Sequence, residues 1–131
     1  MTKILFICVH NSGRSQMGEA FVNNMKRDDI RAFSAGIAQG AGVMSNVIAA
    51  MEELGISMQG HYSKLLTDAM LKEADIIVAT CDDVCVAIPK EIEETKRVEK
   101  WNLPAPVGSI EEVREIRDEI KQKVDELIAT L

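Results

Sequence analysis

Cysteine, arginine and serine side chains lie close together near the start of the chain, in the segment Cys8–Ser15, which reads CVHNSGRS. Only the thiolate form of a cysteine attacks an electrophile, and a helix N-terminus or a nearby arginine favours that form. Arg14 offers a planar guanidinium that binds oxyanions through paired hydrogen bonds. The Ser15 hydroxyl is placed to donate to the sulfur. These residue types and their spacing predict covalent chemistry on phosphate-like groups.

The elements on either side of this segment are expected to position it. Ile4–Ile7 is continuously apolar, as in a strand buried on both faces of a parallel sheet, and a helical pattern runs from Ser15 to about Met25. Small and turn-forming residues between them allow backbone N–H groups to converge on an anion at the helix N-terminus. The predicted oxyanion-binding residues are Val9, His10, Asn11, Ser12, Gly13, Arg14 and Ser15.

Cys8 also has a simpler interpretation as a buried strand cysteine, because free cysteines are among the most buried residues. The strand end, the arginine six places on and the helix start together outweigh that interpretation.

Two further cysteines, Cys81 and Cys85, follow another apolar run at 74–80. On a helical turn, side chains four apart face the same way with Cβ atoms about 5–6 Å apart. A disulfide needs Cβ atoms about 3.5–4.5 Å apart, so pairing these two requires local unwinding. The alternatives are two incidental cysteines, or a zinc site whose second pair of ligands has no suitable spacing.

Composition limits the class of protein. The 131 residues predict a single domain spanning 1–131, with 47% hydrophobic and 27% charged residues, as in ordinary globular proteins. A net charge of −6 argues against nucleic-acid binding, which needs a basic surface. No apolar run approaches a membrane span and no signal peptide precedes Lys3, so we expect a cytoplasmic protein without a membrane partner. Three cysteines do not suggest a disulfide framework.

The rest of the chain alternates between strand and helix patterns, which predicts an α/β fold with a parallel sheet. A capping box, Ser109 with Glu112, opens the last helix, whose apolar stripe reaches Leu131. Residues 81–89 are expected to form a loop or strained turn, and 91–100 to be charged and exposed. The other expected elements are strands at 30–34, 74–80 and 98–101 and helices at 43–54 and 67–73.

The spacing Cys8-(five residues)-Arg14-Ser15 directly after an apolar first strand resembles the low-molecular-weight protein tyrosine phosphatases. The longer string CVHNSGRSQMGEA looks like the arsenate reductase branch of that family, and the segment 34–36, Ser-Ala-Gly, is another shared feature. The resemblance covers nearly the whole chain. It implies a three-layer α/β/α fold with a central four-stranded parallel sheet.

The same resemblance implies a thiol relay with no metal or cofactor. In thioredoxin-coupled arsenate reductases, Cys8 would attack arsenate while Arg14 and the loop hold the oxyanion. Cys81 would then attack Cys8 and release arsenite, and Cys85 would attack Cys81. The resulting Cys81–Cys85 disulfide would be presented to thioredoxin, because thiol–disulfide exchange needs each thiol within reach in turn. We expect the protein to work as a monomer.

One position departs from the family. Relatives carry an Asp-Pro pair before the last helix, with the aspartate as general acid, whereas this chain has Ala105 before Pro106. Alanine transfers no proton, and a positioned acid contributes about 10²–10⁴ in rate. Three explanations stay open: an engineered substitution, natural loss of activity, or an acid supplied from elsewhere in the chain. The nearby candidates for such an acid are Asp82 and Asp83.

A second departure concerns a cation site found in some of these reductases. The matching residues are Asn11, Glu19 and Ser34. Tyr62 and Lys64 stand where relatives can have threonine and aspartate, and the lysine brings a positive charge, so no potassium is predicted. His61 is interpreted as structural.

Two rival functions stay open. The first is a phosphatase acting on phosphotyrosine or small phosphomonoesters, which would need only Cys8. The second is an inactive relative that binds an oxyanion or senses redox state.

Overall fold

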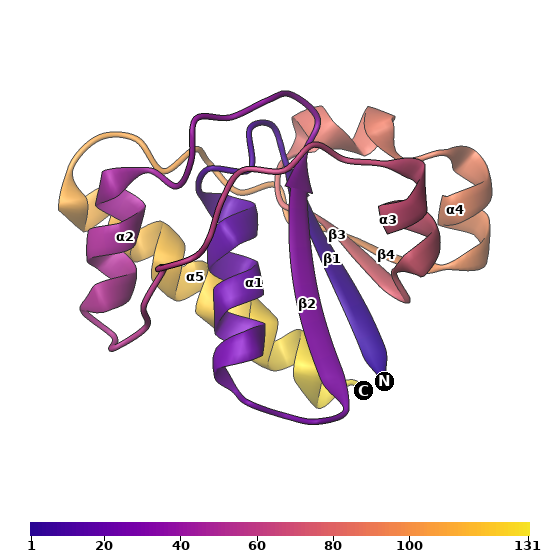
Figure 1. Ribbon diagram of the computed structural model, residues 1–131, viewed down its shortest axis with the longest axis horizontal. Coiled ribbons are helices and arrows are strands. Elements are labelled where there is room, and N and C mark those ends of the chain that lie inside the picture. The colour runs from indigo at the N-terminus through magenta and orange to yellow at the C-terminus, as the bar shows by residue number, and fades with distance from the viewer.

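The computed structural model describes residues 1–131 and contains one four-stranded parallel sheet between two layers of helices (Figure 1). The strand order is β2-β1-β3-β4. The strands are β1 (Thr2–Cys8), β2 (Ile30–Gly36), β3 (Ile76–Ala79) and β4 (Arg97–Lys100). The predicted three-layer α/β/α fold is therefore confirmed.

The helices divide between the two faces of the sheet (Figure 1). One face carries α1 (Arg14–Asn24), α2 (Ser45–Glu52) and α5 (Ile110–Ala129). The other carries α3 (Asp68–Glu73), the 3₁₀ helix η1 (Asp82–Ala87) and α4 (Lys90–Thr95). Side chains cap two of the helices, and the sequence suggests the second of these caps. Thr67 Oγ1 accepts from Met70 N at 3.2 Å, and Ser109 Oγ accepts from Glu112 N at 3.2 Å.

The central strand β1 is buried on both faces, which explains its unbroken apolar run. Ile4 and Phe6 belong to the core under α1, α2 and α5, whereas Leu5 and Ile7 belong to the core under α3 and η1. All four side chains have no exposed surface. The end of β1 is therefore anchored from both sides.

Helix α1 crosses β1 at very close range because of Gly18. A Cβ atom at this position would lie 2.5 Å from the Phe6 ring. The Phe6 ring also packs edge-on against Trp101, with ring centroids 5.7 Å apart. The start of α1 is thus held directly over the sheet.

Helices α2 and α5 are joined through one carboxylate, that of Glu53. Arg114 Nε donates to Glu53 Oε1 at 2.9 Å, and Arg117 Nη1 donates to the same oxygen at 2.7 Å. The hydrogen bond from Arg114, with a further one from Arg117, lowers the pKa of Glu53 to about 2. Arg117 also donates to the Ala50 carbonyl at 2.9 Å.

Several boundaries differ from the sequence prediction. Residues 90–95 form α4, where an exposed charged segment without a helix was expected, and Cys81–Pro89 contains η1. Lys96 Nζ donates to the carbonyl oxygens of Leu71, Lys72 and Ala74 and so joins the end of α4 to the end of α3. Leu131 lies beyond α5 and is 48% exposed. None of the helices has the length and apolar character needed to cross a membrane.

Candidate active site

The carboxyl ends of β1 and β3 meet at one edge of the sheet, where ligands bind in open α/β folds. The order of strands reverses at β1, since β2 and β3 flank it on opposite sides. Ile7 of β1 lies opposite Ala79 of β3, so the residues that follow each strand emerge side by side. Cys8 ends β1 and Cys81 follows β3 by two residues.

The loop after β1 wraps around the Cys8 sulfur. Asn11 N donates to Cys8 Sγ at 3.2 Å, and Asn11 adopts a left-handed conformation with φ of 53° that lets the loop turn back. Ser15 Oγ lies 2.8 Å from the same sulfur. Cys8 is 3% exposed, so the sulfur that the sequence predicts as the nucleophile is nearly covered by the loop.

Asn11 orients the Ser15 hydroxyl. Asn11 Nδ2 donates to Ser15 Oγ at 2.7 Å, and Asn11 Oδ1 accepts from Lys64 N at 3.0 Å, which identifies the two ends of the amide. Because the Ser15 oxygen already accepts one hydrogen, its own hydrogen is free to point at Cys8 Sγ. Two donors therefore face the sulfur, an arrangement that suits a thiolate.

Gln16 holds Asn11 from behind and is a residue that the sequence analysis missed. It has no exposed surface, and its Nε2 lies 3.1 Å from Asn11 O, 3.0 Å from Asn11 Oδ1 and 2.9 Å from Tyr62 O. Its Oε1 lies 2.8 Å from His61 Nδ1. Gln16 lies one helical turn before the buried Ala20, which is a sequence signal for a polar side chain on the inner face of α1.

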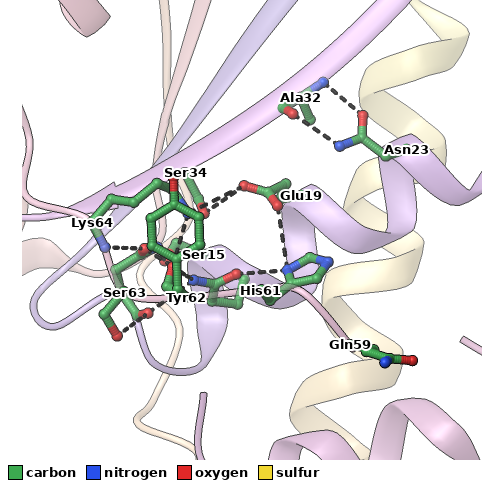
Figure 2. A network of polar contacts seen from close by, with 12 residues as sticks. Ser15, Glu19, Asn23, Ala32, Ser34, Gln59, His61, Tyr62, Ser63 and Lys64 are labelled. Carbon is green, nitrogen blue, oxygen red and sulfur yellow. Dashed lines mark hydrogen bonds and ion pairs between the residues drawn. The ribbon is translucent and has the colours of Figure 1, made fainter. Parts of the chain in front are cut away.

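The polar network continues away from the loop to Glu19 (Figure 2). Its carboxylate accepts from Ser34 Oγ at 2.8 Å and lies 3.3 Å from His61 Nδ1. Because Gln16 Oε1 and Glu19 are both acceptors, His61 Nδ1 carries a proton. Lys64 Nζ lies 3.9 Å from Glu19 Oε1, so the lysine ammonium lies beside the carboxylate. His61 belongs to this network rather than to the cavity wall.

A cavity of about 170 Å³ opens over the loop. It is lined by Cys8, Val9, His10, Ser12, Gly13, Arg14, Met44, Ala105, Pro106 and Val107. Two of the predicted oxyanion-binding residues, Asn11 and Ser15, are fully buried and do not line it. Arg14 Nη1 donates to Leu103 O at 2.8 Å, whereas Arg14 Nε is buried without a partner. An unpaired buried N–H is costly, so Nε favours an anion in the cavity.

The segment that carries Ala105 is fixed on both sides. Arg14 bonds to Leu103 before it, and Asn46 Nδ2 donates to Pro106 O at 2.9 Å after it. Pro106 packs so closely on the loop that a Cβ atom at Gly13 would lie 2.7 Å from its Cγ. Ala105 therefore lines the cavity, where it brings only a methyl group.

The second and third cysteines follow β3, and Cys85 Sγ lies 3.9 Å from Cys81 O. Cys81 is buried and Cys85, on η1, is half-buried; all three cysteines are free. Burial raises the pKa of the Cys81 thiol, while the nearby Arg14 charge opposes that rise and Cys8 adds to it. These influences indicate that Cys81 lies near both residues. The acid candidates Asp82 and Asp83 are exposed on η1 and do not line the cavity.

Comparisons with known proteins agree with this geometry. Residues 3–131 match the family model described as low molecular weight phosphotyrosine protein phosphatase. An arsenate reductase of Staphylococcus aureus (strain Newman) is 38% identical over 128 residues, covering 95% of this chain and 96% of that protein.

Solved structures extend this similarity. An arsenate reductase in its phosphate-binding state has a TM-score of 0.87 and 34% identity, with 99% of this chain and 98% of that chain covered. A thioredoxin-dependent arsenate reductase of Corynebacterium glutamicum has a TM-score of 0.82 and 29% identity, with 99% of this chain and 61% of that chain covered. The chain therefore belongs to the low-molecular-weight phosphotyrosine protein phosphatase family, and within that family it is similar to arsenate reductases.

Proposed function

We propose that the chain reduces arsenate to arsenite through Cys8, Cys81 and Cys85, and that thioredoxin restores the thiols. The observation that carries this proposal is the position of Cys81, buried at the same sheet edge as Cys8 and close to the Arg14 charge. A phosphatase would need only the first cysteine. The similarity to arsenate reductases supports the same choice.

In the first step, arsenate binds over the loop with its oxygens on Arg14 Nε and backbone N–H groups. The Cys8 thiolate attacks arsenic, an S–As bond forms, and an As–O bond breaks so that one oxygen leaves as water. Arsenic stays in the +5 state. The donors on Cys8 Sγ from Asn11 N and Ser15 Oγ keep the attacking sulfur in place.

In the second step, the Cys81 thiolate attacks Cys8 Sγ. The electron pair of the S–As bond passes to arsenic, which leaves as arsenite in the +3 state, and the two sulfurs become a disulfide. Burial raises the pKa of Cys81 and the Arg14 charge opposes this effect, so Arg14 supports the ionised form that attacks.

In the third step, Cys85 attacks Cys81 and sets Cys8 free. The hydrogen bond that opens η1, from Val84 N to Cys81 O, is long at 3.5 Å, and short 3₁₀ helices are weakly held. The helix can therefore unwind to bring the two sulfurs together. Two electrons from the thiols of thioredoxin then reduce the Cys81–Cys85 disulfide. Free thiols of this kind fit the reducing cytoplasm.

The proposal is tested by mixing reduced protein with arsenate and mapping cysteine pairs by mass spectrometry while counting arsenite. Cys85→Ser should yield one arsenite per chain and hold a Cys8–Cys81 disulfide, whereas Cys81→Ser should yield neither. Thioredoxin with its reductase should make only the three-cysteine protein turn over. Folded protein that forms no disulfide with arsenate, both as given and as Ala105→Asp, would contradict the proposal.

Ala105 is expected to limit the rate, because no carboxylic acid lines the cavity to protonate the leaving oxygen. Ala105→Asp should raise the single-turnover rate, because a carboxyl group would then face the leaving oxygen, and the gain should be smaller than the full effect of a positioned acid where another residue already donates the proton. Rapid-quench measurement of arsenite checks this. Equal rates for the two proteins would show that the Ala105 position carries no acid function in this chain.

The rival function is hydrolysis of phosphotyrosine or a small phosphomonoester. It predicts p-nitrophenyl phosphate hydrolysis that survives Cys81→Ser and Cys85→Ser. No phenylalanine, tyrosine or tryptophan lines the cavity to stack on a phenyl ring, which favours an inorganic oxyanion over phosphotyrosine.

A further inference from the structure

The cavity has a single titratable side chain besides those of Cys8 and Arg14, and it belongs to His10. The carboxylates that the sequence suggested as substitute acids, Asp82 and Asp83, do not reach the cavity wall. A group that donates a proton to a leaving oxygen must lie within hydrogen-bond reach of it, directly or through one water. Among the residues that line the cavity, His10 is the one whose side chain can give up a proton near neutral pH without already serving as nucleophile.

The His10 side chain is free to act. It is exposed and forms no hydrogen bond within the chain; only its backbone oxygen is engaged, by Ser12 Oγ at 3.2 Å. The other histidine of the chain, His61, is held by Gln16 and Glu19 at the back of the loop. The two imidazoles therefore occupy different environments: His61 is fixed in the network, and His10 is an exposed residue of the cavity lining.

The charged groups facing His10 are few. The segments 36–44 and 102–108, which pack around the loop, contain no titratable side chain. Cys8 and Arg14 line the same cavity, Cys81 lies near both of them, and the segment 61–64, which contacts the loop at Asn11, brings His61, Tyr62 and Lys64.

We propose that His10 is the general acid of this chain and replaces the carboxylate that position 105 lacks. This inference rests on the proposed arsenate reduction. As Cys8 Sγ bonds to arsenic, the imidazolium N–H gives its proton to the departing oxygen, the As–O bond breaks, and water leaves. His10 is then neutral and regains a proton from solvent. No electrons are transferred in this step.

A pH dependence follows from this role. Imidazole gains and loses its proton near neutral pH, unlike an ordinary carboxyl group. Because the acid must start protonated, the first-step rate should fall at high pH, where an imidazole is neutral and has no proton to give. His10→Asn should lower the plateau rate by about 10²-fold or more, since asparagine transfers no proton. The fall of the rate at high pH, called here the high-pH limb, should also disappear.

The experiment measures single-turnover arsenite release from the reduced full chain without thioredoxin, between pH 5.5 and 9 (roughly the range over which imidazole titrates). Inorganic phosphate binding, followed by thermal shift, serves as the second readout and should change less than threefold in His10→Asn. Addition of imidazole to His10→Gly should restore part of the rate. Asp82→Asn and Asp83→Asn should show the same high-pH limb of the single-turnover rate as the parent.

A double variant tests whether a second proton donor can replace His10. His10→Asn combined with Ala105→Asp should recover the rate, because the carboxyl group restores a proton donor. A His10→Asn rate within twofold of the parent, or an unchanged limb, overturns the proposal. If Ala105→Asp releases arsenite and the parent does not, arsenate reduction stands and the His10 role fails. If neither protein releases arsenite, both proposals fail.

Discussion

Asn11 controls two neighbouring side chains through the two ends of one amide. Its nitrogen donates to Ser15 Oγ, and its oxygen accepts from Gln16 Nε2 and from Lys64 N. The direction of the Ser15 hydroxyl, and so the hydrogen bond to Cys8, depends on which way that amide points. Side chains with no contact to the cavity therefore determine how the sulfur is held.

Gln16→Leu tests this dependence. Leucine is similar in size but cannot donate to Asn11 or Tyr62, and buried polar groups that lose their partners each cost about 1–3 kcal/mol. We expect a loss of roughly 2–4 kcal/mol in the free energy of unfolding in urea, together with slower attack by Cys8 on arsenate. Gln122→Leu, on the exposed face of α5, is the matched control and should be near neutral. A Gln16→Leu protein as stable as this control would contradict the assignment.

The residues of the loop could be predicted from local sequence, whereas their supports could not. Cys8, Arg14 and Ser15 lie within eight consecutive residues, so their spacing is visible directly. The contacts of Gln16 with Tyr62 and of Asn46 with Pro106 join residues 46 and 60 positions apart. Such contacts depend on how distant segments pack, and no local pattern reports them.

At the scale of elements, two helices that flank the same face of the sheet are joined by an ion cluster. Glu53 lies at the end of α2 and meets Arg114 and Arg117 of α5. The hydrogen bond from Arg114 is the main reason why the pKa of Glu53 falls from 4.5 to about 2. The unfolded chain therefore binds more protons than the folded chain in this pH range.

The stabilisation from Glu53 should be complete above its unfolded pKa of 4.5 and disappear as pH falls through about 2. Urea midpoints measured from pH 6 downwards should therefore fall more steeply for the parent than for Glu53→Gln, which has no carboxylate to protonate. Glu52→Gln, one residue earlier and without an ion pair, should follow the parent. Parallel curves for the parent and Glu53→Gln would rule out this linkage.

Most elements could be predicted from periodicity, and α4 shows where periodicity fails. Residues 90–95 have one large apolar side chain, Ile92, so no apolar stripe marks the helix. Its place is maintained by tertiary contacts, including Lys96 Nζ on the carbonyl oxygens at the end of α3. The last helix, with a long stripe and a serine cap, was predicted with nearly its observed start.

At the scale of the whole molecule, the contact between Gly18 and Phe6 sets the distance of α1 from the sheet. The oxyanion loop joins these two elements, so its shape depends on that distance. The neighbouring strand β3 then delivers Cys81 to the same edge. The approach of Cys81 to the end of β1 is thus a property of the sheet order as much as of either cysteine.

Gly18→Ala should destabilise the protein by roughly 1–3 kcal/mol, because the new methyl group overlaps the Phe6 ring in a close-packed core. The cost should shrink in a Phe6→Leu background, where the ring is gone. A double-mutant cycle of urea unfolding measures this coupling. Additive effects of the two substitutions would show that the contact does not limit the approach of α1.

The composition of β4 affects whether the sheet can pair with the sheet of another molecule. This strand lies at an edge of the sheet, has only four residues, and carries charges at Arg97, Glu99 and Lys100. Open strand edges invite pairing with other chains, and shortness and charge are the usual protections. A second copy that approached this edge would find few backbone groups to pair with and would have to strip water from charged side chains. The exposed border of the sheet therefore resists sheet-to-sheet aggregation.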